Sequence, residues 1–160
     1  MKHSERKYRV KDFKAIKQKL TDVHAQKIKQ AVTTHYYAQL IGNDVIKLVH
    51  YEDRDEIHKL KEANGAFTLT DRIPVVNAES GLKWLKQRGH TETSKIIMAY
   101  EEYSYKGGIV GLYVINDDLY SVILDYPPRQ FVLIEKQFNL DKAEVIDMPY
   151  NKYIQNNPIS

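Results

Sequence analysis

Cysteine is absent from the chain, and its absence excludes several kinds of site. Without thiols there can be no disulfide framework, no thiolate metal centre and no cysteine nucleophile. The sequence also lacks an apolar run near the roughly 18 residues of a membrane-spanning helix, and its N-terminus is polar rather than signal-like. These absences predict a soluble, cytoplasmic protein without a membrane partner.

The chain also has little excess charge. Its 24 basic and 21 acidic residues leave a formal net charge of +3, spread evenly along the sequence. Such a charge does not by itself indicate a nucleic-acid-binding protein. The 12 tyrosines could stack single-stranded nucleic acid on a small barrel, but they follow the alternation of core or rim residues in strands. This pattern argues against nucleic acid as the partner.

Several catalytic motifs are missing too. The sequence has no GxxxxGKS phosphate loop, no glycine fingerprint for dinucleotides, no HExxH metal pair and no serine elbow. Its 160 residues and 42% hydrophobic content predict one domain, residues 1–160, with a single core. The function must therefore be sought in the pattern of the secondary structure.

That pattern is mainly β. Amphipathic helices are predicted over 13–23, behind Asp12 as a cap, and over 78–88, between Asn77 and Gly89. Strands are predicted over 3–10, 31–39, 44–51, 56–62, 66–73, 94–105, 109–115, 119–125 and 130–137. Turns are predicted at Gly42-Asn43-Asp44, Asp53-Arg54-Asp55, Asn64-Gly65, Lys106-Gly107-Gly108, Asn116-Asp117-Asp118 and Pro127-Pro128. Eight or nine strands in hairpin order favour an α+β fold, mainly antiparallel β, that closes into a tunnel-like barrel with a few peripheral helices.

The first predicted strand carries charge on both faces. In HSERKYRV, residues 3–10, alternation separates His3, Glu5, Lys7 and Arg9 from Ser4, Arg6, Tyr8 and Val10. If the sheet closes into a barrel, one charged face points inward. Charged side chains are tolerated there only if the interior is a water-filled tunnel that binds a charged ligand. The alternative is a cross-strand ion pair of Glu5 and Lys7 on a solvated face.

These residues resemble a known family. ERKYRVKDF, at 5–13, is similar to the opening strand of the CYTH superfamily, the triphosphate tunnel enzymes, which carries the pattern glutamate, any residue, glutamate, any residue, lysine. Later stretches resemble that family in the same order: QAVTTHYYAQ at 30–39, VIKLVHYED at 45–53, KLK at 59–61, YSVILDY at 120–126, FVLIEKQF at 131–138 and MPYNKYI at 148–154. The resemblance extends over about the whole chain, in short motifs.

The resemblance implies an eight-stranded tunnel in which acidic residues at one end hold Mg²⁺ or Mn²⁺ and basic residues bind a triphosphate. The family's activities include adenylate cyclase, thiamine triphosphatase and inorganic triphosphatase. Carried over residue by residue, it implies metal binding by Glu5, Asp125 and Glu135, with His3 as a further candidate. It implies phosphate binding by Lys7, Arg9, Lys47 and Lys61, and catalytic roles for Glu5, Lys7, Asp125 and Glu135.

The sequence also departs from the family pattern. His3 and Leu133 replace expected acidic residues, Val49 replaces an expected arginine, and Met98, Ala99, Glu101 and Glu102 occupy a stretch where lysine and arginine are expected. Three functions therefore stay open: a metal-dependent triphosphatase, a non-catalytic module that binds an anion in a degraded tunnel, and a protein-interaction scaffold. Hydrolysis is favoured over cyclisation, because nothing in the sequence would orient a ribose and a base. A homodimer is left open.

Overall fold

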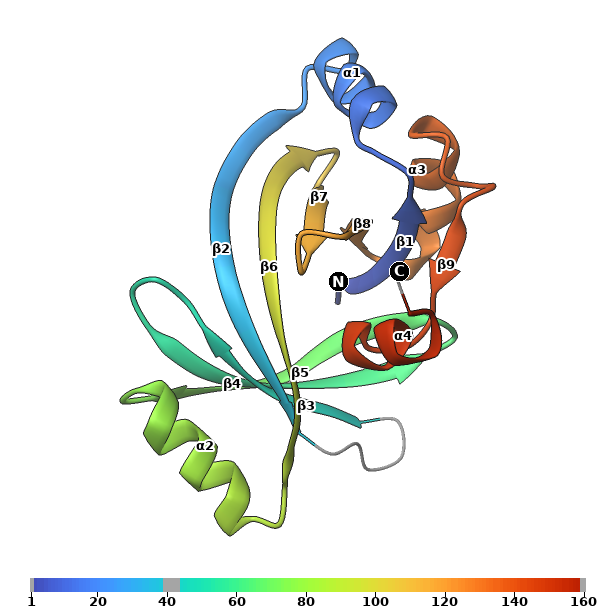
Figure 1. The fold of residues 1–160 in the computed structure, drawn as a ribbon. Coiled ribbons are helices and arrows are strands. Elements are labelled where there is room, and N and C mark those ends of the chain that lie inside the picture. Colours follow the sequence, from blue (N-terminus) through green and yellow to red (C-terminus); the bar gives the residue numbers. More distant parts are fainter. Residues whose placement is uncertain (1, 39–43, 159–160) are drawn as a thin grey trace.

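The computed structural model describes residues 2–38 and 44–158, which form nine strands and four α-helices (Figure 1). In chain order they are β1 (Ser4–Val10), α1 (Lys14–Asp22), β2 (Gln26–Ala38), β3 (Asp44–His50), β4 (Asp55–Ala63), β5 (Ala66–Val75), α2 (Ala78–Gln87), β6 (Glu92–Tyr105), β7 (Gly108–Ile115), β8 (Leu119–Tyr126), α3 (Phe131–Gln137), β9 (Glu144–Ile146) and α4 (Tyr150–Asn156). No helix among these residues is long and apolar enough to cross a membrane.

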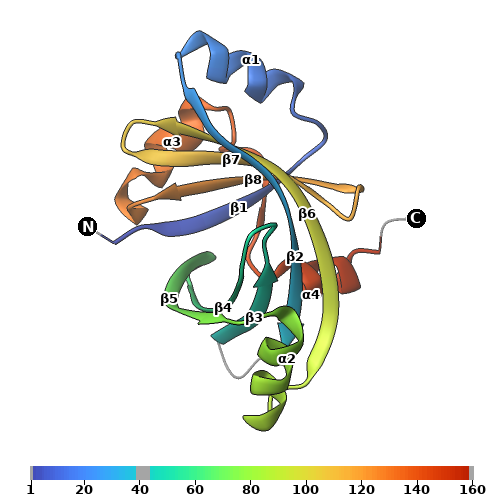
Figure 2. The ribbon, with the colours of Figure 1, turned by 90° about the vertical axis from the view of Figure 1, so that its left-hand side faces the viewer.

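The strands form one antiparallel sheet that curls into a ring. Their order is β5-β4-β3-β2-β6-β7-β8-β1-β9, and a further pairing of β5 with β1 closes the ring of the first eight strands. This seam is short: it joins Glu5 to Phe67 and Arg6 to Ala66. Beyond it, β9 pairs with the rest of β1, from Lys7 to Arg9. The predicted α+β fold with a tunnel-like antiparallel barrel is confirmed, as Figure 2 shows from the side.

Three of the predicted turns have the backbone that tight hairpins need. Asn64 and Gly65 have φ angles of 54° and 76°, and Asn116 and Asp117 have 51° and 58°. Positive φ at both central residues is the mark of the turn type that matches the twist of paired strands. Residues 106 and 107 follow the same pattern, with 48° and 77°. The turn predicted at Gly42-Asn43-Asp44 lies mostly outside the described residues.

Both predicted helices are present, with the expected signals at their starts. Asn77 accepts a hydrogen bond from the backbone N–H of Ser80 at 2.8 Å, and Ser80 Oγ accepts one from the backbone N–H of Asn77 at 3.2 Å, which together form a capping box for α2. The Asp12 side chain accepts a bond from the backbone N–H of Lys14 at 2.9 Å, at the start of α1.

The strand predicted over 130–137 is wrong, because residues 131–137 form α3 and Gln130 belongs to the 3₁₀ turn before it. The signal that decides it is a helical spacing: Phe131, Ile134 and Phe138 are buried, whereas Val132 and Leu133 between them are each 60% exposed. The chain leaves the sheet at the two prolines that precede the helix, and a short 3₁₀ turn over Pro128–Gln130 leads into α3. Glu135 therefore stands on a helix.

α3 packs against one face of the sheet and leaves the other face of β1 to the interior of the ring. Tyr8 of β1, Leu124 of β8, and Phe131 and Ile134 of α3 belong to one buried apolar cluster. The side chains that alternate with Tyr8 point the opposite way, so Glu5 and Lys7 line a cavity within the ring. This arrangement explains why β1 carries charged residues on both faces: one face packs against α3, and the other lines the cavity.

Candidate functional site

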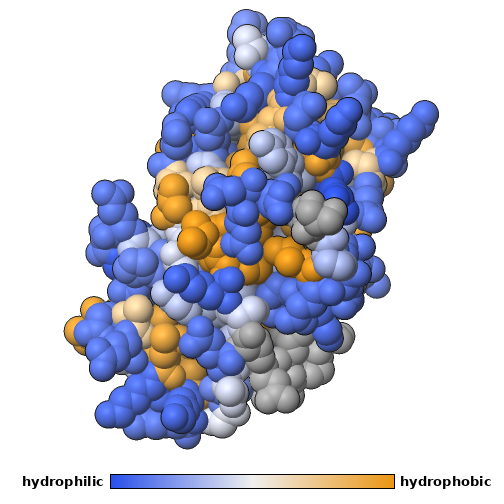
Figure 3. All heavy atoms as spheres, in the orientation of Figure 1, coloured by the Kyte–Doolittle hydropathy of each residue, from blue (hydrophilic) through white to orange (hydrophobic). Residues whose placement is uncertain are grey.

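The ring encloses a cavity of about 400 Å³. Its charged lining residues come from six strands: Glu5, Lys7, Lys29, Lys47, Arg72, Glu102 and Asp125. Aromatic and imidazole side chains make up much of the remaining wall: His35, Tyr37, Tyr51, His58, Phe67, Tyr100, Tyr113 and Tyr150. Viewed as in Figure 1, this side of the molecule shows hydrophobic atoms at its centre with hydrophilic atoms around them (Figure 3). The interior thus offers charge, hydrogen bonds and aromatic surface together.

Lys7 is the most enclosed cation of the cavity, with only 6% of its surface exposed. Its ammonium group donates a hydrogen bond of 2.6 Å to the backbone carbonyl of Met148 and lies 4.0 Å from the ring centre of Phe67 and 4.3 Å from that of Tyr150. Burial first and the nearby charge of Lys47 second lower the pKa of Lys7 to about 7, although the charges of Glu5 and Asp147 oppose the shift. Lys7 is thus a poorly compensated cation.

Lys47 enters the same cavity from β3. Burial lowers its pKa to about 8, although the charge of Glu5 opposes the shift. Its ammonium group lies 5.2 Å from the ring centre of Tyr37, and it forms no hydrogen bond or ion pair with any residue that the structure describes. The buried ammonium group of Lys7 and the half-buried one of Lys47 stand on different strands and repel each other, so an anion between them would stabilise both.

Glu5 and Asp125 form an acidic pair at the same level of β1 and β8, where they are directly opposite partners. Burial raises the pKa of Glu5, and the negative charge of Asp125 raises it further. Burial also raises the pKa of Asp125, while its 3.1 Å contact with the His3 ring lowers it. Like charges that face each other across a strand pair compete for one proton or for a shared cation.

Two histidines add uncharged polar groups next to the lysines. His35 is buried, and burial lowers its pKa well below the usual value, with Lys47 adding to the shift. Its Nε2 lies 2.8 Å from Thr33 Oγ1, but its Nδ1 has no hydrogen-bond partner among the described residues. Burial likewise lowers the pKa of His58 to about 4, so this ring is neutral at pH 7. The His35 Nδ1 atom is thus a buried polar atom without a partner among the described residues, whereas the neutral rings themselves form part of the cavity lining.

The structure brings together four of the residues singled out from the sequence: Glu5, Lys7, Lys47 and Asp125 all line the cavity. Arg9 and Lys61 do not. Arg9 is exposed, and its guanidinium donates a hydrogen bond of 3.0 Å to the Tyr153 hydroxyl. Lys61 is exposed on the outer face of β4, because His58 and Leu60 take the inward positions of that strand.

Glu135 lies on the other side of β1. Its Oε1 accepts hydrogen bonds from Arg6 Nη1 at 2.9 Å and from the Tyr8 hydroxyl. Arg6 and Tyr8 belong to the face of β1 that packs on α3, so Glu135 ties the helix to the sheet and does not meet Glu5. The expected grouping of these two carboxylates is absent because residues 131–137 are helical.

The residues present do not fit a metal site held by the protein alone. Of the implied ligands, Glu5 and Asp125 are paired and His3 contacts Asp125, but Glu135 is separated from them by the sheet. Across the described residues, no group of three or more His, Asp or Glu side chains is close enough to hold a metal ion. The implied Mg²⁺ or Mn²⁺ site is therefore incomplete.

Among solved structures, the chain is similar to the PH1012 protein from Pyrococcus horikoshii OT3, with a TM-score of 0.83, 14% identity and coverage of 94% of this chain and 98% of that one. A provisionally assigned adenylate cyclase from Vibrio parahaemolyticus matches with a TM-score of 0.75, 11% identity and coverage of 97% and 98%. The chain has the fold of these proteins. A third match is HpAC1 from Hippeastrum, a provisionally assigned adenylyl cyclase described as having a dominant triphosphatase activity, with a TM-score of 0.67, 10% identity and coverage of 100% and 98%. No family model and no curated protein sequence matches.

The fold likeness agrees with the tunnel-like architecture implied by the opening strand. At identities of 10 to 14% it concerns the fold and leaves the ligand to be argued from the cavity. The cavity residues that sequence reasoning did not single out include Lys29 and His35 of β2, His58 of β4 and Arg72 of β5. One signal was available for His35, because Thr33, His35 and Tyr37 alternate along β2 and all three line the cavity.

Proposed function

We propose that the protein binds a small polyphosphate anion, either a nucleotide or another organic or inorganic triphosphate, inside the ring of strands. The observation that carries this proposal is the pair of ammonium groups of the buried Lys7 and the half-buried Lys47, of which the second has no hydrogen bond or ion pair within the described chain. Phosphate oxygens replace the lost hydration of such groups and form charge-assisted hydrogen bonds with them.

The dimensions and walls of the cavity support the proposal. A volume of about 400 Å³ lies within the range of small-molecule sites. Tyr100 and Tyr113 stack with ring centres 4.7 Å apart in the wall, so an organic group attached to the phosphates would find aromatic surface. The shared fold with HpAC1 is consistent with a ligand of this class.

Binding, rather than hydrolysis, is the function that the geometry supports best. A hydrolase of the implied kind needs a metal, and the chain gathers only two of the three expected carboxylates. Phosphate release is therefore a separate measurement in the experiment below.

Calorimetric titration with ATP, tripolyphosphate and thiamine triphosphate, each with and without Mg²⁺ or Mn²⁺, tests the proposal. We expect binding by the wild type and a loss of about tenfold or more in Lys47→Met, because a charge-assisted contact is removed. Lys61→Met is the matched control, since it removes an exposed lysine outside the cavity, and its affinity should not change. Equal affinities in all three proteins, or no binding of any anion, would show that the lysine pair is not an anion site.

A further inference from the structure

Lys7 is enclosed by the wall of the cavity but has no carboxylate partner there. Its side-chain nitrogen lies 4.0 Å from the ring centre of Phe67 and 4.3 Å from that of Tyr150, and it donates a hydrogen bond of 2.6 Å to the Met148 carbonyl. No carboxylate of the described residues lies within ion-pair distance of this nitrogen. Because buried lysines are almost always paired with an opposite charge, an unpaired one indicates a role for the amine itself.

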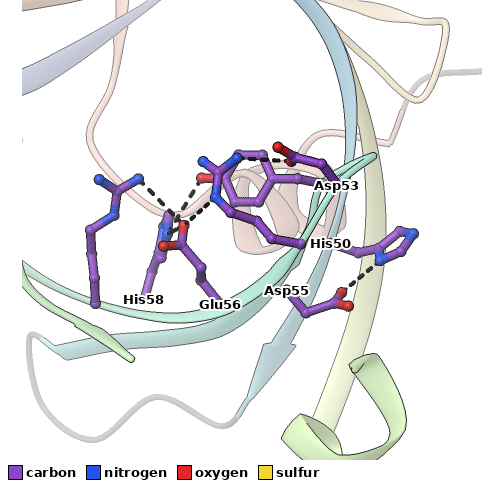
Figure 4. A network of polar contacts seen from close by, with 8 residues as sticks. His50, Asp53, Asp55, Glu56 and His58 are labelled. Atoms are coloured by element: carbon purple, nitrogen blue, oxygen red, sulfur yellow. Dashed lines mark hydrogen bonds and ion pairs between the residues drawn. The ribbon is translucent and has the colours of Figure 1, made fainter. Parts of the chain in front are cut away.

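Other basic groups of the cavity do have a carboxylate partner. His58 Nε2 lies 3.3 Å from Glu56 Oε1 (Figure 4), and Arg72 Nη2 lies 3.4 Å from the same oxygen. A guanidinium also stays protonated in proteins, so it has no lone pair with which to attack a ligand. The groups that remain as nucleophiles are the amines of the lining lysines, and Lys7 is the most buried of these.

A substantial share of Lys7 is a free amine at neutral pH. Burial and the charge of Lys47 lower the pKa of Lys7 to about 7, so about half of its amine is uncharged at this pH. An exposed lysine has only roughly one uncharged amine in a few thousand. A desolvated lysine beside another cation is a known form of activated nucleophile. The hydrogen bond to the Met148 carbonyl uses an N–H of the amine and leaves its lone pair available.

Lys47 complements this amine with a positive charge. It stands on β3 in the wall of the same cavity, and it has no hydrogen bond or ion pair with a described residue. Its pKa of about 8 keeps it mainly protonated at pH 7. A cavity of about 400 Å³ thus contains one lysine that is partly a free amine and one that is mainly a cation. Together they suit a small ligand with a carbonyl group and an anionic group.

We propose that Lys7 acts as a nucleophile that forms an imine with the carbonyl group of a small phosphorylated aldehyde, whose phosphate binds to Lys47. This inference uses the cavity of the proposed function but goes beyond it, because it assigns a covalent reaction with a ligand that is not a triphosphate.

The reaction is a condensation that releases one water molecule. The nitrogen lone pair of Lys7 attacks the carbonyl carbon, and a carbon–nitrogen double bond replaces the carbon–oxygen bond as the oxygen leaves. The two hydrogens of the amine leave with that oxygen as water, so the reaction needs no oxidant or reductant. Glu5 lies two residues before Lys7 on the same face of β1 and also lines the cavity. Its carboxyl, whose pKa burial raises, is the group that passes a proton to the departing oxygen.

Borohydride trapping with pyridoxal 5′-phosphate as the probe tests the proposal. The chain is incubated at neutral pH with an equimolar amount of the probe, borohydride reduces any imine to a stable amine, and peptide mapping by mass spectrometry locates the label. We expect the label mainly at Lys7 in the wild type. Pyridoxal, which lacks the phosphate, should label Lys7 about tenfold less, because the contact with Lys47 is missing.

Three variants locate the reaction. Lys7→Met should lose the main label, whereas Lys61→Met, which removes an exposed lysine outside the cavity, should keep it. Lys47→Met should still be labelled at Lys7 but should need about tenfold more pyridoxal 5′-phosphate to reach the same extent. Thermal unfolding shows whether each variant is folded. If Lys7→Met does not fold, peptide mapping of the wild type alone decides where the label lies.

The outcomes separate this proposal from the proposed function. A wild type in which Lys7 is no more labelled than Lys61 would refute the imine, and equal labelling of Lys7 by pyridoxal and by its phosphate would refute the role of Lys47. If tripolyphosphate binds in calorimetry while Lys7 stays unlabelled, the imine fails and the proposed function stands. If Lys7 is labelled but tripolyphosphate neither binds nor protects it from the label, the proposed function fails and the imine stands.

Discussion

At the scale of single residues, the proposed anion site depends on two lysines, Lys7 and Lys47, whose charged forms are destabilised by the loss of hydration. Lys7 keeps one hydrogen bond, to the Met148 carbonyl, and Lys47 keeps none with the described residues. Each ammonium group therefore loses hydration that the protein only partly replaces. The folded chain therefore favours the neutral amines more than the unfolded chain does, with pKa values of about 7 for Lys7 and about 8 for Lys47, and this difference makes both stability and binding depend on pH.

The first prediction concerns stability. The pKa values of about 7 for Lys7 and about 8 for Lys47 lie below that of a lysine in the unfolded chain, so between about pH 7 and pH 10 the unfolded chain holds more protons. The free energy of unfolding should therefore rise with pH in this window, by at most about 1.4 kcal/mol per pH unit for each lysine. Urea unfolding across the window measures the slope, which should fall in Lys47→Met and persist in Lys61→Met. An unchanged slope in Lys47→Met contradicts the assignment.

The second prediction concerns proton uptake on binding. A bound polyphosphate stabilises the ammonium forms and raises both pKa values, so binding at about pH 8 should take protons from the buffer, whereas binding at about pH 6 should take few. Calorimetry in two buffers of different ionisation enthalpy gives the number of protons transferred. Identical heats in the two buffers at pH 8 would mean that the lysines are already charged before the anion binds.

At the scale of elements, the alternation of inward and outward side chains along each strand predicted part of the site. The other residues could not be predicted in this way, because local irregularities interrupt the alternation. In β5, Leu69 is opposite Leu60 and Asp71 is opposite Lys59, so Thr70 is an extra residue in the pairing. This bulge reverses the alternation, so that Phe67 and Leu69 face inward before it and Arg72 after it. Strict alternation from Phe67 would point Arg72 outward, which is why the sequence did not reveal it.

The helix α3 explains why the sequence prediction for Glu135, as a strand residue facing the site, was wrong. The run FVLIE has the composition of a strand, but burial of Phe131 and Ile134 against β1 and β8 outweighs that preference once the chain has left the sheet at Pro127. By contrast, Glu5, Lys7, Lys47 and Asp125 lie on regular stretches of strand, and there the sequence pattern predicted the inward face correctly.

The third prediction separates anchoring from ligand binding at α3. Glu135→Ala leaves the Arg6 guanidinium and the Tyr8 hydroxyl without their shared acceptor, so the free energy of unfolding should fall by about 2–3 kcal/mol. Affinity for tripolyphosphate should stay unchanged, because the carboxylate lies outside the cavity. Leu133→Ala, on the exposed face of the same helix, should alter neither quantity. Loss of affinity without loss of stability in Glu135→Ala would restore the ligand role that the sequence resemblance implied.

At the scale of the whole molecule, the ring of strands has its shortest strand pairing where it closes. β5 pairs with β1 only at Glu5 and Arg6, and β9 takes over the same edge of β1 from Lys7 onward. The inner lysines stand on either side of this seam: Lys7 is on β1, and Lys47 is on β3, two strands beyond β5. A polyphosphate held by both lysines therefore bridges the seam.

The fourth prediction follows from that bridge. Hydrogen exchange followed by mass spectrometry should show that tripolyphosphate slows amide exchange more in residues 4–7 and 66–68, at the seam, than in the hairpin of β6 and β7, which pairs continuously from Met98 to Tyr105. Lys47→Met should show little such change at the same anion concentration, because the anion then contacts one side of the seam only. Equal slowing at the seam and in the β6–β7 hairpin would mean that the ligand stabilises the whole ring without crossing its closure.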